Sequence, residues 1–290
     1  MVGALAAGEA ARALGTDAVV GGLTWERRPV DPLPGPRRLS EISGAQPLHA
    51  AVALAGVGGA EVTGPGGFRF CESDMAAFLG EPTVLVDPNP GPAAIAAGLD
   101  VAAAHLGCDL VLLLDVGGDV LAHGDEPGLA SPLADATVLS AALRMTTPTL
   151  AALFGIGCDG ELTPAEVLER LAEVAAAGGV LGDVPLPAAA LDRIEGALQT
   201  VTTEASAMAL RCARGETGRV PIRGGRRTVP LTADGGRLVL LDPIATIHSA
   251  ARLAAAVAEA PDLEAAQAIL TALGVRTELD FEREAAHDIA

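Results

Sequence analysis

The feature that most restricts the fold is a run of five aliphatic residues, 110–114, that lies between Asp109 and Asp115. A continuous apolar run of this length predicts a strand that is buried on both faces, as in the centre of a parallel sheet. Gly117 and Gly118 follow where that strand should end, and they give the backbone freedom for a tight turn. We therefore expect a small-molecule site here, because open α/β sheets usually bind ligands at the carboxyl ends of their strands.

Carboxylates are concentrated in the residues that follow this run. Asp119, Asp125, Glu126 and Asp135 come within a short span after Asp115. An acid pair such as Asp115 and Asp119 is costly to desolvate without a cation or a hydrogen-bond donor. Clusters of oxygen ligands suit Mg²⁺ and Mn²⁺. We therefore take Asp115 and Asp119 as candidate metal ligands.

Apolar runs alternate with helical patterns along most of the chain, and this alternation predicts the fold. Parallel strands need crossover connections, so we expect an α/β fold of the three-layer, Rossmann-like type, with a mostly parallel sheet and helices on both faces. Length and composition fit a single α/β domain over residues 1–290, in which about 187–235 forms a helix-plus-hairpin subregion over the site. The predicted strands lie near residues 17–23, 82–87, 110–116, 149–156 and 237–242.

Four of these strands end at or just before an aspartate, namely Asp87, Asp115, Asp159 and Asp242. In a parallel sheet those ends share one edge, so the four acids are expected to converge on one crevice. The alternative for any single one of them is a helix cap or a turn residue, which is the commoner role. Only the pair of Asp115 and Asp119 favours a functional role over that alternative.

Three residues are candidates for proton transfer: Asp119, His123 and Glu161. His123 lies next to the acidic loop, and the ordinary pKa of histidine is close to neutral. Glu161 belongs to a second acidic glycine turn, residues 157–161, which leads to a predicted helix N-terminus. Such a terminus attracts anions, although Asp159 or Glu161 could cap that helix instead.

Two further segments are candidates for substrate binding. A predicted hairpin over residues 219–231 carries Arg223, Arg226 and Arg227, and arginines can hold a carboxylate or phosphate through paired hydrogen bonds. Arg223 and Arg226 are our candidate clamps, with a solvated hairpin as the alternative. Trp25, next to Glu26 and Arg27, either covers a ligand or packs at the surface beside a solvated ion pair.

The acidic composition excludes several classes of partner. Nineteen basic residues stand against 37 acidic ones, and the formal charge of −18 repels nucleic acid and anionic membrane surfaces. Aromatic residues make up 2% of the chain, so platforms for base stacking are scarce. No apolar run reaches the roughly 20 residues that span a bilayer. We expect neither a nucleic-acid nor a membrane partner.

Cysteine usage and missing motifs limit the compartment and the cofactors. The four cysteines lie far apart, without the Cys-x-x-Cys spacing of zinc or redox sites. Residues 1–12 lack the features of a signal peptide, so a cytoplasmic location fits best. Walker A, complete Gly-x-Gly-x-x-Gly and His-Glu-x-x-His patterns are absent, and no organic cofactor is indicated.

Six motifs in a fixed order resemble a family catalogued as domain of unknown function 1152. The resemblance covers nearly the whole chain and implies that these positions belong to one site, which adds Gly117, Gly118, Gly160, Glu204 and Ser206 to the candidates for substrate binding. The Asp-x-Gly-Gly-Asp turn is also similar to the Asp-Gly-Gly-Asn turn of D-glutamate cyclases, which are lyases. The six motifs lie at residues 25–27, 115–119, 131–133, 159–162, 203–206 and 222–226.

The resemblance also implies a strand and a glycine-rich turn ahead of the first predicted helix, residues 4–14. We expect the natural protein to begin upstream of Met1, and the strand at 17–23 to have an open edge in the present chain.

Taken together, these patterns predict an enzyme that acts on a small anionic metabolite, phosphorylated, carboxylated or nucleotide-like, with the help of Mg²⁺ or Mn²⁺. A metal-assisted hydrolase or lyase is favoured. The alternatives are a metal-independent lyase or cyclase and a non-catalytic protein that binds a metabolite. Ala-rich helices near the carboxyl terminus leave a homo-oligomer open.

Overall fold

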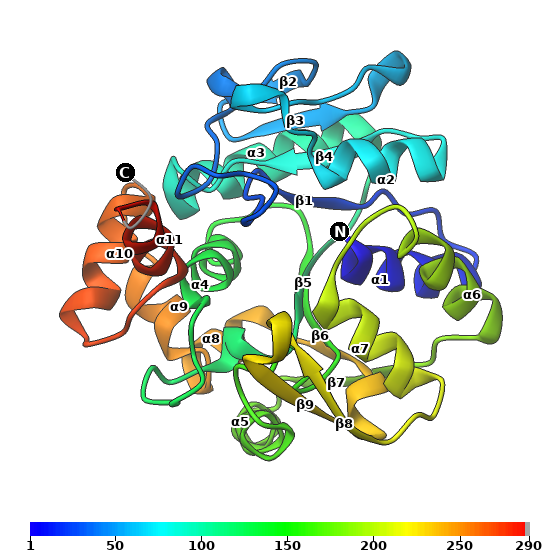
Figure 1. Cartoon of the computed structure of the whole chain (residues 1–290), viewed down its shortest axis with the longest axis vertical. Coiled ribbons are helices and arrows are strands. Elements are labelled where there is room, and N and C mark those ends of the chain that lie inside the picture. The colour runs from blue at the N-terminus through cyan, green and yellow to red at the C-terminus, as the bar shows by residue number, and fades with distance from the viewer. Residues whose placement is uncertain (288–290) are drawn as a thin grey trace.

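The computed structural model of the protein describes residues 1–287. Within that range it contains two four-stranded sheets, one two-stranded hairpin and eleven α-helices, so the fold is mixed α/β, as predicted (Figure 1). Across residues 1–287, every helix is too short or too polar to cross a lipid bilayer.

The first sheet is built from the first third of the chain and has the strand order β1-β4-β3-β2. Strand β1 lies parallel to β4, whereas β3 pairs antiparallel with both β4 and β2. Helix α3 packs on β2 and β3, and α2 packs on β3 and β4. The bounds are β1 Gly21–Leu23, β2 Gln46–His49, β3 Val52–Ala55, β4 Thr83–Val86, α2 Cys71–Leu79 and α3 Gly91–Leu106.

The second sheet has the strand order β5-β6-β10-β7 and separates two hydrophobic cores. Ala151 and Leu153 of β6 belong to one core, with α4, α5 and α8 to α10, while Ala152 and Phe154 belong to the other, with α1, α6 and α7. This alternation follows from the two-residue period of a strand. The strands are β5 Val111–Val116, β6 Thr149–Phe154, β7 Val180–Val184 and β10 Leu238–Leu241. The helices are α1 Val2–Ala13, α4 Pro132–Ala141, α5 Pro164–Ala176, α6 Ala188–Ala197, α7 Glu204–Ala213, α8 Pro243–Ser249, α9 Arg252–Val257, α10 Leu263–Ala272 and α11 Glu278–His287.

The prediction of one mostly parallel sheet is wrong. In the two four-stranded sheets only β1 with β4 and β5 with β6 are parallel pairs. The connection between β2 and β3 has only two residues, which permits a hairpin but no crossover. Strand β10 runs antiparallel to β6, so Asp242 lies at the opposite end of the sheet from Asp115. There Asp242 caps α8 by accepting a hydrogen bond from the N–H of Ala245 at 2.7 Å.

Strand β5 is an edge strand, and this overturns the expectation of a central strand buried on both faces. It pairs with β6 on one side, and in the described part of the chain no strand pairs with its other side. Five of its six side chains are therefore only half-buried, although the strand is apolar apart from Asp115. Strand β1 is likewise the edge of the first sheet.

The region 187–235 forms two helices and a hairpin. The single helix expected from about 187 to 213 is divided into α6 and α7 by residues 198–203. The hairpin forms as predicted around Gly224 and Gly225, with β8 at Gly218–Ile222 and β9 at Arg227–Leu231.

Glu278 connects the last helix to the beginning of α4. Its side chain is 5% exposed, and its carboxylate oxygens accept hydrogen bonds from the N–H groups of Leu133 and Ala134 at 3.0 and 2.9 Å. The first N–H groups of a helix have no partner inside the helix, so this carboxylate satisfies two of them. Glu278 also pairs with Arg27 at 3.4 Å. One buried side chain thus joins α11, α4 and the segment that follows β1.

We predict that Glu278→Ala lowers the free energy of unfolding by about 3 kcal/mol, because it leaves buried N–H groups without an acceptor. Glu284→Ala on the same helix is the matched control. Glu284 is 65% exposed and pairs only with Arg276, so its loss should cost about 0.5 kcal/mol or less. Urea denaturation of both variants measures the difference. Equal losses would contradict the connecting role of Glu278.

Candidate functional site

The structure brings five carboxylates together around the carboxyl ends of β5 and β6. Asp115 is the next-to-last residue of β5, Asp119 lies in the one-turn 3₁₀ helix that follows, and Asp135 lies in the first turn of α4. Asp159 and Glu161 follow β6. Oxygens of Asp115, Asp119 and Asp135 lie within 4.8 Å of one another, and so do oxygens of Asp119, Asp159 and Glu161. Asp119 is therefore shared by two groups, each of which could hold a metal ion. We call these five residues the acidic cluster.

The glycine pair after β5 makes this proximity possible. Gly117 and Gly118 have φ of +130° and +110°, which disfavour any residue with a side chain. A Cβ atom on Gly117 would lie 2.3 Å from Cγ of Asp159, so only glycine leaves room for that carboxylate. The N–H of Gly118 donates a hydrogen bond to Oδ2 of Asp115 at 2.8 Å.

Asp159 is the least satisfied member of the acidic cluster. It is 5% exposed, and neither Oδ1 nor Oδ2 has a hydrogen-bond partner among residues 1–287. Buried carboxylates are normally paired or hydrogen-bonded, since desolvating an ionised one costs several kcal/mol. A ligand or cation that supplies the missing partner would relieve this cost.

Burial and like charge perturb the acidity of the cluster. Burial raises the pKa of Asp119, Asp135 and Asp159 well above the ordinary value of aspartate, and neighbouring carboxylates raise it further. Burial also raises the pKa of Asp115, but hydrogen bonds, first among them the one from Gly118, oppose the effect and the pKa reaches about 6. Without a cation, the cluster therefore retains protons near neutral pH.

Glu161 differs from its neighbours because its charge is fully partnered. It accepts hydrogen bonds from the N–H groups of Ala130 and Ser131 at 2.7 and 2.8 Å, and from the Ser131 hydroxyl at 2.5 Å. Nη1 of Arg227 lies 3.2 Å from its Oε1. Ser131 is the residue before α4, and its side chain accepts no hydrogen bond from the first turn of that helix. Glu161 thus has partners consistent with a positioning role as well as the predicted proton transfer.

His123 lies beside α5. Its Nε2 is 3.3 Å from Oε2 of Glu173, and burial together with Arg170 lowers its pKa. The ring is not part of either group of carboxylates that could hold a metal. The structure therefore places this predicted catalytic residue toward α5 and gives it no contact with the acidic cluster.

The side chains of Trp25, Glu26 and Arg27 point to two different sides of the segment that follows β1. Trp25 is 7% exposed, and its Nε1–H donates to the carboxylate of Glu282 at 3.1 and 3.2 Å. The guanidinium of Arg27 lies 4.2 Å from the Trp25 ring centroid. Glu26 instead accepts a hydrogen bond from the N–H of Cys71, at the start of α2. Trp25 and Arg27 thus attach α11 to this segment.

The three arginines of the hairpin also lie in different surroundings. Arg223 and Arg226 lie in the exposed turn, where Glu204 accepts hydrogen bonds from the N–H of Arg223, both at 3.0 Å. Arg227, at the start of β9, reaches the acidic cluster instead, and it donates to the carbonyl oxygens of Asp159 and Gly128 at 3.4 and 3.2 Å. Gly160, with φ of +72°, lies beside Arg227, whereas Ser206 is buried in α7.

Sequence reasoning missed two members of the site. Asp135 was counted among the acids but assigned no role, and Arg227 was not preferred over Arg223 and Arg226. The signal for Asp135 was its place in the first turn of a helix that begins at a recognisable Ser131-Pro132. Asp87, which was expected to converge with Asp115, lies in the first sheet and accepts a hydrogen bond from the N–H of Leu39 at 3.0 Å.

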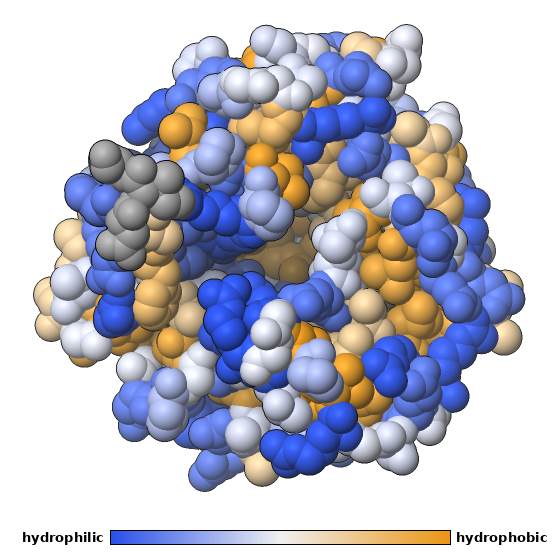
Figure 2. All heavy atoms as spheres, in the orientation of Figure 1, coloured by the Kyte–Doolittle hydropathy of each residue, from blue (hydrophilic) through white to orange (hydrophobic). Residues whose placement is uncertain are grey.

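A hollow opens at the centre of the face shown in Figure 2, with an apolar floor and hydrophilic side chains around it. In the same orientation, β5 passes through this position in Figure 1, between α4 and α1. Asp115, Asp135 and Thr246 line a cavity of about 30 Å³ whose other lining residues are apolar, such as Val120 and Leu139. That cavity holds roughly two water molecules, so a metabolite has to approach from the open side.

We predict that Asp159→Asn raises the free energy of unfolding by about 1–2 kcal/mol at pH 7 in the presence of a chelator. The native pKa of Asp159 is raised above its unfolded value of about 3.9, so its contribution to stability falls as pH rises from there. The gain should therefore shrink as pH is lowered toward 4. Urea denaturation at a series of pH values measures it.

Asp100→Asn is the matched control with the opposite sign. Slight burial raises the pKa of Asp100, but hydrogen bonds from Thr147 and Thr146 outweigh it and lower the pKa to about 2. Its stabilisation is present above about pH 4 and is lost as pH falls toward 2, so this variant should lose stability at pH 7. Destabilisation by Asp159→Asn at pH 7 would show that Asp159 has a favourable partner.

The comparisons with known proteins identify a family. The model of the family described as "Protein of unknown function (DUF1152)" matches residues 1–286. Comparison with curated proteins and with solved structures gave no match. The match agrees with the resemblance drawn from the six motifs, and the chain therefore belongs to the DUF1152 family.

Proposed function

We propose that the protein is an enzyme that acts on a small anionic metabolite with the help of a divalent cation, Mg²⁺ or Mn²⁺, bound at the acidic cluster. The observation that carries this proposal is Asp159, a buried carboxylate whose two oxygens lack partners beside Asp119. The cluster contains only oxygen ligands, the kind that these two cations prefer. Asp115, Asp119, Asp135 and Asp159 are the proposed ligands.

The charge of the cluster supports a cation over a bare anion site. Among the five carboxylates, only Glu161 forms an ion pair in the described structure, with Arg227. The carboxylates other than Glu161 would repel an anionic substrate unless a cation neutralised their charge first. A bound divalent cation would supply that charge and polarise an oxygen of the substrate.

Arg227 supports an anionic substrate. Its side chain is 22% exposed, and only one carboxylate lies within ion-pair distance of it. The guanidinium has donors beyond those used for Glu161 and the two carbonyl oxygens. We propose that Arg227, rather than Arg223 or Arg226, contacts a carboxylate or phosphate of the substrate.

A metal-independent lyase or cyclase is the second candidate, and the acidity of Asp115 and Asp119 favours it. The pKa of Asp115 is raised to about 6, while burial and the charge of Asp115 raise that of Asp119 well above its ordinary value. Burial and like charge thus raise the two pKa values to different extents, as in acid–base pairs whose environments separate their pKa values. Such a pair transfers protons without a metal.

We also propose a cytoplasmic location. The four cysteines are free, which fits a reducing compartment.

Isothermal titration with Mg²⁺ and Mn²⁺ tests the cation. We expect binding by the wild-type protein, and affinity more than about tenfold lower for Asp119→Asn and Asp159→Asn, because each removes a charged ligand. Asp125→Asn, an exposed acid of the same loop that belongs to no group of potential ligands, should bind like wild type. No binding, or equal binding by all three variants, would remove the metal from the proposal.

A thermal-shift screen of anionic metabolites tests the activity. Each hit is incubated with the protein and analysed by mass spectrometry, with and without EDTA. The leading proposal predicts a chemically changed ligand, and loss of turnover in EDTA. Turnover that resists EDTA would favour the lyase on Asp115 and Asp119. A tightly bound ligand that remains unchanged would identify a binding protein and overturn both enzymes.

A further inference from the structure

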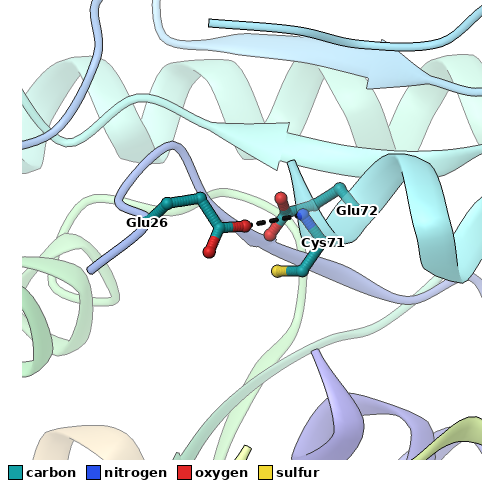
Figure 3. A group of neighbouring side chains, drawn as sticks. All are labelled: Glu26, Cys71 and Glu72. Atoms are coloured by element: carbon teal, nitrogen blue, oxygen red, sulfur yellow. Dashed lines mark hydrogen bonds between the residues drawn. The ribbon is translucent and has the colours of Figure 1, made fainter. Parts of the chain in front are cut away.

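A second group of potential ligands lies outside the acidic cluster. Glu26 follows β1, while Cys71 and Glu72 are the first two residues of α2. One ligand atom from each lies within 4.8 Å of the others. Figure 3 shows the two carboxylates and the thiol turned toward a common point, with Oε1 of Glu26 accepting a hydrogen bond from the N–H of Cys71 at 2.6 Å.

Glu72 is buried without a partner. It is 1% exposed, and its Oε2 has no hydrogen-bond partner among residues 1–287. Space for its carboxylate depends on Gly22 of β1, because a Cβ atom there would lie 2.2 Å from Oε1 of Glu72. The positive charge of the Met1 amino group lowers the pKa of Glu72 in part, but among residues 1–287 no cationic group lies within ion-pair distance of this carboxylate.

No side chain in the described structure supplies that partner. None of the ion pairs among residues 1–287 includes Glu26 or Glu72. Burial, and then the like charge of Glu26, raise the pKa of Glu72 to about 8. Two acids of the same sign thus face each other across a thiol.

We infer that Glu26, Cys71 and Glu72 form a site for a thiophilic divalent cation of the zinc type, separate from the acidic cluster. Zinc binds cysteine sulfur at about 2.3 Å and carboxylate oxygen at about 2.0–2.2 Å. Two ligands of one tetrahedral zinc ion are therefore about 3.6 Å apart, which is compatible with three ligand atoms inside 4.8 Å. The thiol distinguishes this site from a magnesium site, since Mg²⁺ prefers oxygen.

The site has a structural consequence and an open position. The cation joins the end of β1 to the beginning of α2, two segments that are 45 residues apart in the chain. Three protein ligands leave a fourth tetrahedral position free, and Cys71 and Glu26 are only half-buried, so solvent or a small ligand can reach it.

Titration of the full chain with Co²⁺ tests the site, because a cobalt–thiolate bond has a charge-transfer absorption that a carboxylate site lacks. We expect this band to saturate at one equivalent in the wild-type protein, to disappear in Cys71→Ser, and to need more than about tenfold more cobalt in Glu72→Gln. Cys108→Ser, which removes a half-buried cysteine elsewhere, should leave the band unchanged. Asp119→Asn should also leave it unchanged, which separates this site from the acidic cluster.

Protection from alkylation provides a test on the wild-type protein alone. Zn²⁺ should slow the reaction of Cys71 with iodoacetamide without slowing that of Cys108, as followed by mass spectrometry of peptides. Absence of the cobalt band in reduced wild-type protein, its persistence in Cys71→Ser, or equal alkylation of Cys71 with and without zinc would each overturn the inference.

Discussion

Repulsion between carboxylates that are buried away from water governs the region at the end of β5. Asp115, Asp119 and Asp159 are 7%, 4% and 5% exposed, and each faces other carboxylates. The effective cost of burying an uncompensated ion is several kcal/mol. The surroundings offset this cost unevenly, since Asp115 accepts a hydrogen bond from Gly118 while Asp159 has no partner in the described residues. A bound cation would offset what remains of this cost.

Several local features follow from the same constraint. Gly117 has to be glycine because Asp159 occupies the space where a side chain would lie. The N-terminus of α4, which would otherwise attract an anion, is occupied by the protein's own carboxylates, Glu161 and Glu278. An external anion thus has to use Arg227 or a bound cation.

The segment that follows β1 contributes Glu26 to the second proposed site and contacts α11 through the two neighbouring residues. Its side chains alternate, so Trp25 and Arg27 face α11 while Glu26 faces α2. Alternation is the ordinary property of extended backbone. A motif of three consecutive residues therefore contacts two different neighbours, α11 and α2.

The local features of this protein were determined by its sequence. Aliphatic runs marked β4, β5, β6 and β10, the hairpin formed around Gly224 and Gly225, and the turn after β5 was evident from its glycines. These signals are readable because side-chain period and backbone freedom depend on neighbouring residues alone. The meeting of Asp115 with Asp119 belongs to the same class, since only the three residues 116–118 of one turn separate them.

The tertiary structure alone decided the direction of β10, the edge position of β5 and the membership of the site. Asp242 lies at the wrong end because β10 is antiparallel to β6, whereas Asp135 and Arg227 arrive from α4 and β9. Nothing in the residues near Arg227 distinguishes it from Arg226. The difference comes from where β9 packs. Strand direction and contacts between distant charges depend on the free energy of the whole packed chain, and no local pattern encodes that.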